Sequence, residues 1–477
     1  MSGVKLRSSG KRQQVSDQRK AAHSLRHVDL LHRALTWIVG KRIFNLSGIH
    51  GNTSWQVPHL ITLALLWAWS DQSQLTSAFE EGRLAALGQF HDLSLHTYQG
   101  FIRALTTWTE RLKPLLWSRL WRLMEEVGGA YWRKGEFLAL AIDGSRLTVP
   151  RTKENEKAFA APNFGYGARA KSRRKWKNKK RRSKKLGTPV KPQIWLTMIW
   201  HMGLKMPWCW KHGPSTSSER QHVLDLLKDQ SFPKNTLFCA DAGFVGHEFW
   251  TAILAAGHHF LIRVGGNIQL LRKLGKTQQR GDIFYCWPKG AMHHKRAPLL
   301  LRLMKFQGAR GSIYLVTNVL DPRRLSQNRA KELYRLRWGV ELQFRALKQT
   351  FGRSKLRSRT PDRALVELDW SLLGLWIIQL FAVKEQIEID IPPERSSIAR
   401  ALAIFRDLLR NRHQVVASPR MLTLKLREAT KDAYDRESRK QGRYRPNYKQ
   451  AHTATKPKIR LANQAERKLY ARLTTAA

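Results

Sequence analysis

The stretch "FLALAIDGSRLTVP" at residues 137–150 sets one aspartate, Asp143, inside an otherwise apolar run. Its first half has the continuous apolar pattern of a buried strand, and strand character continues beyond the Asp-Gly pair. A carboxylate at such a position is costly to bury without a partner. The stretch therefore predicts a buried strand with an aspartate that needs a partner.

A second buried strand, "TLFCADAGF" at residues 236–244, ends in Asp241 and a glycine-containing turn. Strand-like residues 193–210 precede it, and a helical pattern at 246–258 leads from it to the strand "HFLIRV". Strands that alternate with helices predict an α/β sheet with helices packed on it. Ligands bind at the carboxyl ends of strands in such sheets, although an aspartate before glycine is by itself also a common turn residue.

The stretch "YRLRWGVELQFRALK" at residues 334–348 predicts an amphipathic helix with one polar edge. At about 100° per residue its polar members fall within an arc of about 60°: Tyr334, Arg337, Glu341 and Lys348. The neighbouring apolar stripe would pack on a sheet. A glutamate flanked by Arg and Lys suits a site that handles metal-bound phosphate. The alternative is a simple pair between Arg337 and Glu341, worth only about a few tenths of a kcal/mol.

Together, Asp143, Asp241 and Glu341 predict three carboxylates that converge in a strongly cationic protein. Such oxygen ligands would bind two divalent cations, and Mg²⁺ fits them.

The composition favours a polyanionic partner. The 477 residues include 86 Lys and Arg against 35 Asp and Glu, a net charge of +51, and so large a surplus favours nucleic acid. The basic runs lack the apolar face of a membrane-surface helix, and the longest apolar run, 370–383, is too short to span a bilayer and predicts a buried helix. With no secretory signal and three separated cysteines, we expect buried thiols in a reducing, cytoplasmic compartment.

The composition and the hydrophobic periodicity change several times along the chain, and these changes predict five regions. A capping box of Thr216 and Glu219 is expected to begin the helix over 216–230. The helical N-terminal region is either a DNA-binding unit or a structural bundle, and the tail at 437–460 is expected to be poorly ordered. The regions are a flexible basic arm (1–27), an all-α domain (28–130), an α/β core (131–264 and 319–390), a β-rich insertion (265–318) and a helical, basic C-terminal region (391–477).

The spacing of Tyr334, Arg337, Glu341 and Lys348 resembles the signature of IS4-family DDE transposases, which have an RNase H-like catalytic core. The blocks "AIDGSRLTVPRT", "PQIWLTMIW", "GPSTSSER", "FCADAGF" and "LVTNVL" also resemble that family in the right order, over roughly residues 138–351. The resemblance implies an α/β fold: an RNase H-like mixed sheet flanked by helices, with a β-rich insertion and an all-α N-terminal domain.

The resemblance also implies a reaction. Asp143, Asp241 and Glu341 would be the catalytic residues and would hold two Mg²⁺ ions, for which Mn²⁺ would substitute. One ion would activate a water or a 3′-hydroxyl and the other would stabilise the leaving oxygen. The enzyme would cleave the ends of a mobile element and join the 3′-OH to target DNA. Tyr334, Arg337 and Lys348 would contact DNA phosphates, and the expected assembly is a homodimer on paired terminal inverted repeats at the bacterial nucleoid.

Two further features are weaker candidates. Trp287 is the candidate for holding a flipped base, and burial within the β-rich insertion is its alternative explanation. The basic stretch at 171–185 departs from a plain family core and is either a solvated loop or a set of phosphate contacts, which set affinity but cannot read sequence. Its predicted DNA-binding residues are Arg173, Arg174, Lys175, Lys179, Lys180 and Arg181.

Two other functions fit the same residues. An inactivated transposase relic would bind DNA without cutting it. A nuclease of the same fold would hydrolyse DNA without joining ends.

Overall fold

The computed structural model of the chain describes residues 35–40, 49, 53, 55–87, 90, 93–159, 191–275, 281–308, 311–410, 420–432 and 455–475. The arm predicted at 1–27 and the basic stretch at 171–185 lie outside these residues. The N-terminal part is helical, as its apolar periodicity predicts. Its long helices are α2 (Val57–Trp69), α3 (Leu75–Leu87) and α4 (Tyr98–Gly128).

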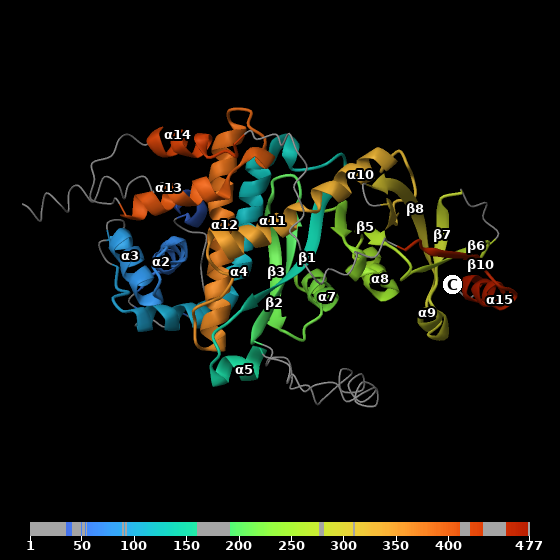
Figure 1. Cartoon of the computed structure of the whole chain (residues 1–477), viewed down its shortest axis with the longest axis horizontal. Helices are drawn as coiled ribbons and strands as arrows, with labels where there is room; N and C mark the ends of the chain where they lie inside the picture. Colours follow the sequence, from blue (N-terminus) through green and yellow to red (C-terminus); the bar gives the residue numbers. More distant parts are fainter. Residues whose placement is uncertain are drawn as a thin grey trace, which may run out of the picture.

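Ten strands form one mixed sheet in the order β10-β6-β7-β8-β9-β5-β4-β1-β2-β3 (Figure 1). Strands β1, β2 and β3 are antiparallel neighbours, and β4 and β5 run parallel to β1. This part of the sheet has the strand order of the expected RNase H-like core. Its strands are β1 (Leu138–Thr148), β2 (Gln193–His201), β3 (Met206–Pro214), β4 (Thr236–Ala240) and β5 (His259–Val264).

The β-rich insertion continues this sheet instead of forming a separate one, because β9 pairs with β5 in antiparallel fashion. Its elements are β6 (Gln269–Arg272), β7 (Ile283–Cys286), α9 (Lys289–His293), β8 (Leu299–Gly308) and β9 (Gly311–Thr317). The expectation of a poorly ordered tail is wrong for its last residues. There β10 (Lys458–Leu461) pairs in parallel with β6, and α15 (Gln464–Thr475) packs with the insertion around a small second core.

Helices cover both faces of the sheet (Figure 1). On β1, the Asp143 side chain points to the segment of α10 and α11, whereas a Cβ at Gly144 would meet Glu219 of α7. Successive residues of a strand point to opposite faces, so α7 and α11 lie on opposite sides of β1. The helices of the core are α5 (Lys153–Phe159), α7 (Glu219–Asp229), α8 (His247–Ala255), α10 (Gln327–Leu336), α11 (Gly339–Arg345) and α12 (Pro361–Ile387).

Helix α12 joins the N-terminal helices to the sheet. By length and composition it could cross a membrane, but its most apolar window is entirely buried inside the protein, which confirms the predicted buried helix. It packs against α2, α4 and β3, and one hydrophobic core continues from α2 across residue 130 into the sheet. Two further helices, α13 (Ile398–Arg410) and α14 (Arg420–Glu428), pack on α12.

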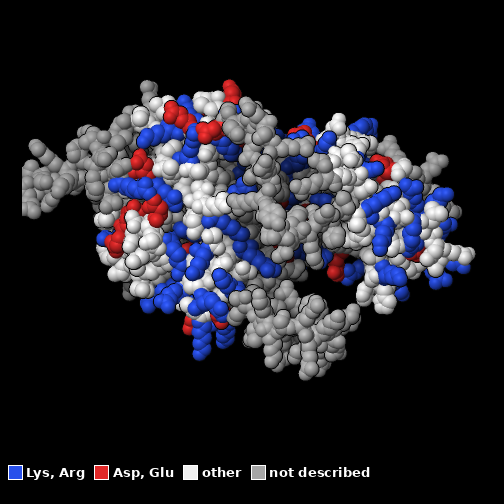
Figure 2. Space-filling model, viewed as in Figure 1, with Lys and Arg blue, Asp and Glu red and all other residues white. Residues whose placement is uncertain are grey.

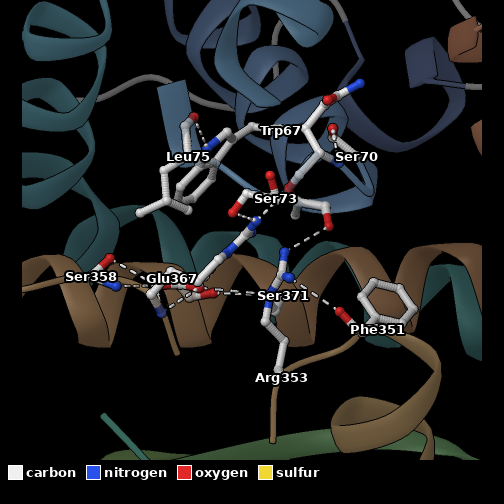
Figure 3. Close-up of polar contacts among 12 residues, drawn as sticks. Trp67, Ser70, Ser73, Leu75, Phe351, Arg353, Ser358, Glu367 and Ser371 are labelled. Carbon is white, nitrogen blue, oxygen red and sulfur yellow. Dashed lines mark hydrogen bonds and ion pairs between the residues drawn. The ribbon is translucent and has the colours of Figure 1, made fainter. Parts of the chain in front are cut away.

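A polar network fastens the loop that precedes α12 to the N-terminal helices (Figure 3). The Arg353 guanidinium donates to Ser371 Oγ at 2.9 Å and to the Ala68 carbonyl at 3.3 Å. Arg357 donates to the Gln72 carbonyl at 2.6 Å, and the Glu367 carboxylate accepts from the backbone amide of Arg357 at 2.9 Å. The loop is therefore fixed to both α12 and the turn after α2.

Candidate active site

Asp143 and Asp241 occupy equivalent positions on neighbouring parallel strands. The last pair between β1 and β4 joins Ala141 to Cys239. Asp143 comes two residues after Ala141, and Asp241 comes two residues after Cys239. Neighbouring strands lie about 4.8 Å apart, so the register brings the two aspartates side by side where β4 ends. Asp241 begins the short 3₁₀ turn Ala242–Phe244, and its Oδ1 accepts from the Gly243 amide at 2.8 Å.

The signature stretch is not the single regular α-helix that the spacing argument assumed. Helix α10 ends at Leu336, and a tight turn follows in which the amides of Val340 and Glu341 donate to carbonyls three residues earlier. Helix α11 then passes into a π-helical segment, Ala346–Thr350, which contains Lys348. Segments of this kind are rare and are frequent at functional sites. The tight turn overwinds the helix and the π segment underwinds it, so the polar edge still faces β1 and β4.

Arg337 links the helix to the first aspartate. Its side chain is 9% exposed, and its guanidinium lies 2.9 Å from Glu341 and 3.6 Å from Asp143. The helical pair foreseen as the simple alternative thus exists, but it includes a carboxylate from β1 as well. The Arg337 Nε atom is buried and has no partner among the described residues, an unusual state for a buried donor.

The other two signature residues lie beside the same pair of strands. The Arg337 guanidinium lies 5.7 Å from the Tyr334 ring, and burial raises the pKa of Tyr334, so its hydroxyl remains a donor at neutral pH. The ammonium of Lys348 donates to Ser145 Oγ at 2.7 Å. Ser145 follows Asp143 by two residues and points to the same face of β1.

The site concentrates negative charge in a partly buried place. Burial raises the pKa of Asp143 to about 6, and the charges of Asp241 and Glu341 also raise it. The hydrogen bond from the Gly144 amide and the charge of Arg337 lower this pKa. The Asp143 and Glu341 side chains are 19% and 32% exposed. These carboxylates are therefore enclosed enough to repel one another and open enough to receive a ligand.

The chemistry of the donors fits divalent cations. Three carboxylates supply hard oxygen ligands, the kind that Mg²⁺ takes. A closer group elsewhere, Glu110, His212 and Asp369, has its ligand atoms within 4.8 Å of one another among the described residues. The Lys113 ammonium already lies 2.8 Å from Glu110 and 3.1 Å from Asp369. A side-chain cation thus neutralises that group, and we assign it a structural role.

The weaker candidates lie apart from this cluster. Trp287 is 2% exposed, and its indole N–H donates to the Arg296 carbonyl at 2.8 Å within the small core of the insertion. A flipped base could not reach a ring covered in this way, so this burial argues against base flipping by Trp287. Residues 173–181 of the basic stretch lie outside the described residues.

The sequence pattern missed a fourth carboxylate. The N-cap of α7 is Ser218, whose side chain accepts from the Gln221 amide, so the expected capping box of Thr216 and Glu219 is wrong. Glu219 is instead the first residue of the helix and lies against Gly144. Burial raises its pKa, and the charges of Asp143 and Asp241 raise it further.

Comparison with known proteins adds independent information. The family model "Transposase DDE domain" matches residues 134–377. Over 245 residues the chain is 27% identical to the transposase InsG for insertion sequence element IS4 of Escherichia coli strain K12. The match covers 49% of each protein, so the chain spans about half the length of this curated relative. A piggyBac transposase synaptic complex with hairpin DNA is similar over 87% of each chain, with a TM-score of 0.40 and 11% identity.

Proposed function

The chain belongs to the transposase DDE-domain family, and from this membership we propose that it cleaves the ends of a mobile DNA element and joins the freed 3′-OH to target DNA. The family implies the use of divalent metal, and we propose Mg²⁺, with Mn²⁺ able to replace it. The observation that carries the proposal is the register of β1 and β4, which sets Asp143 beside Asp241 under the helix that bears Glu341.

Each residue of the cluster has a task in this proposal. Asp143, Asp241 and Glu341 hold the cations through carboxylate oxygens. Bound cations supply activation of the attacking oxygen and neutralisation of the charge that develops on the leaving oxygen. Arg337 keeps Asp143 and Glu341 in place, and we propose that its guanidinium also contacts a DNA phosphate. Tyr334 and Lys348 orient phosphates next to the scissile bond, for which their fixed positions suit them.

The surface supports a DNA partner. Figure 2 shows Lys and Arg over much of the viewed face, including the lobe where β6, β7, β10 and α15 lie. This lobe has exposed basic residues on two elements: Arg272 and Lys273 at the end of β6, and Arg467, Lys468 and Arg472 on α15. We propose that they contact the DNA backbone, as do the basic residues at 173–181. We propose a homodimer on paired ends at the nucleoid as the assembly.

Cleavage of the element's own ends tests the proposal. The substrate is a supercoiled plasmid that carries the inverted repeats flanking the coding sequence. We expect nicks or breaks at the repeat ends in Mg²⁺ and none in EDTA. Glu341→Gln should remove the cleavage, whereas Glu332→Gln, a matched change at an exposed position of α10, should retain it. No cleavage by the wild-type chain, with specific binding to the repeats, would favour the inactivated relic.

Joining separates a transposase from a nuclease of the same fold. The donor is a pre-cleaved repeat end with a free 3′-OH, labelled at its 5′ end, and the target is a plasmid. We expect labelled plasmid in Mg²⁺, and its loss when the donor ends in a dideoxynucleotide. Cleavage of the first substrate without any joining of this donor would support the nuclease.

A further inference from the structure

The carboxylate of Glu219 lies close to the backbone of β1 at Gly144, next to Asp143. A Cβ placed on Gly144 would lie 2.2 Å from Glu219 Oε1 and 2.6 Å from Cδ, so only glycine leaves room for it there. The side chain therefore has a defined position at the first turn of α7. It approaches β1 from the face opposite α11, just past the point where pairing between β1 and β4 ends.

Local structure does not account for this position. Ser218 caps the helix, and no cation of a Lys or Arg side chain lies within ion-pair distance of Glu219 among the described residues. Its surroundings include the Asp143 and Asp241 charges, which disfavour a third charge, and the Trp195 indole and the more distant Arg146 charge, which favour it. The Trp195 Nε1 atom is buried and has no hydrogen-bond partner among the described residues. A carboxylate held next to two others gains its compensation from a cation.

We propose that Glu219 is a fourth acidic group of the cation site, which binds a divalent cation directly or through a water of its coordination sphere. The proposal rests on the proposed function, because it assumes that Asp143 and Asp241 hold divalent cations. The site would then enclose its cations from both faces of the sheet, with α11 on one side and α7 on the other. Mg²⁺ retains several of its waters when it binds proteins, and such waters need acceptors of this kind.

Mn²⁺ binding to the full chain, followed by electron paramagnetic resonance of the free ion, tests the proposal. We expect Glu219→Gln to weaken binding by about tenfold or more, the usual cost of losing a group that supports a metal ligand. Glu248→Gln is the matched control, because Glu248 also lies in the first turn of a helix, α8, but is exposed and paired with Arg296. This control should bind Mn²⁺ as the wild type does.

Asp143→Asn distinguishes the two possible failures. If the wild type binds Mn²⁺, Asp143→Asn loses it and a folded Glu219→Gln binds normally, the fourth acidic group is excluded and the proposed function stands. If neither the wild type nor Asp143→Asn binds, both proposals fail. Cleavage of the wild-type backbone by Fe²⁺ and ascorbate supplies a second readout that does not depend on a variant. We expect cuts near residues 143, 219 and 241 that excess Mg²⁺ suppresses, and cuts at 143 and 241 alone would overturn the inference.

Discussion

The buried carboxylates of α12 and the carboxylates of the active site are both enclosed by the fold, but their partners differ. Asp369 lies 3.1 Å from the Lys113 ammonium, 3.1 Å from His212 Nε2 and 2.6 Å from the Trp210 indole nitrogen. Burial alone would raise its pKa, yet Lys113 and His212 hold the pKa well below its usual range. Asp143 has one distant cation, Arg337 at 3.6 Å, and two carboxylate neighbours, and its pKa rises to about 6.

The partners of a buried carboxylate distinguish a structural acid from a functional one. A carboxylate that the fold needs is surrounded by donors that compensate its lost hydration. A carboxylate that awaits a ligand keeps uncompensated charge, which the folded chain tolerates at a cost in stability. Substitution should therefore affect the two classes in opposite ways.

The largest effect is expected on catalysis by Asp241→Asn. Loss of one cation ligand should lower the rate of end cleavage to below about one ten-thousandth, roughly 5.5 kcal/mol in the barrier. The midpoint of urea unfolding in EDTA should be equal to or higher than that of the wild type, because one repelling charge is gone. A lower midpoint together with lost activity would place Asp241 among the structural acids instead.

Asp369→Ala should show the converse pattern. It leaves the Lys113 ammonium buried without its inner partner, and breaking a buried ion pair in this way costs about 3–5 kcal/mol. Urea unfolding measures this loss. Asp362→Ala provides the control, because Asp362 is an exposed residue in the first turn of the same helix and its loss should cost less than about 1 kcal/mol. Equal effects of the two changes would contradict the comparison.

The two acids should also respond oppositely to pH. For Asp143 the folded pKa of about 6 lies above the unfolded value, so ionisation weakens the folded state as pH rises from about 4 to about 6. In EDTA, the free energy of unfolding of Asp143→Asn should rise relative to that of the wild type across this window, by at most about 3 kcal/mol. For Asp369 the folded pKa is lowered, so its contribution is present above about pH 4 and is lost only as pH falls further.

Unfolding free energies at several pH values between about 4 and 8 check both statements. The advantage of Asp143→Asn should grow with pH and then level off, whereas Asp369→Asn should show a deficit throughout this range. A deficit of Asp143→Asn that grows with pH would mean that Arg337 outweighs the effects of burial and repulsion.

The sequence predicted those carboxylates of the active site that stand out in a local pattern. A polar residue in an apolar strand drew attention to Asp143 and Asp241, and the spacing on one helix drew attention to Glu341. Glu219 was missed because its spacing from Thr216 also fits a helix cap, and only the fold shows that Ser218 takes that role. Which carboxylates meet is decided by strand register and by which helix covers which face, and neither is local in the sequence.

Other differences have the same cause. The tail at 437–460 is basic enough to predict disorder, yet its end becomes β10 because β6, far away in sequence, offers a free edge and α15 supplies an apolar cover. The family match to residues 134–377 bears out the resemblance seen in the signature.

Asp369 lies next to a long apolar run of its own helix. The donors that compensate its burial come from α4 and β3, which are distant in the sequence.

The smallest effect on stability is expected in the loop before α12, where the buried charge is the cation of Arg353 instead of a carboxylate. Arg353 is 5% exposed and burial lowers its pKa to about 10; its hydrogen bonds reach Ser371 and the Ala68 carbonyl, and the Glu367 carboxylate lies farther away at 3.9 Å. Arg353→Leu should cost about 2 kcal/mol, because neutral acceptors lose their donors while Glu367 keeps Arg357 and two backbone amides. Hydrogen exchange should quicken in the turn after α2 before it changes in β1, since the loop ties these regions together. If exchange instead quickened equally throughout, Arg353 would support the whole fold and not only this loop.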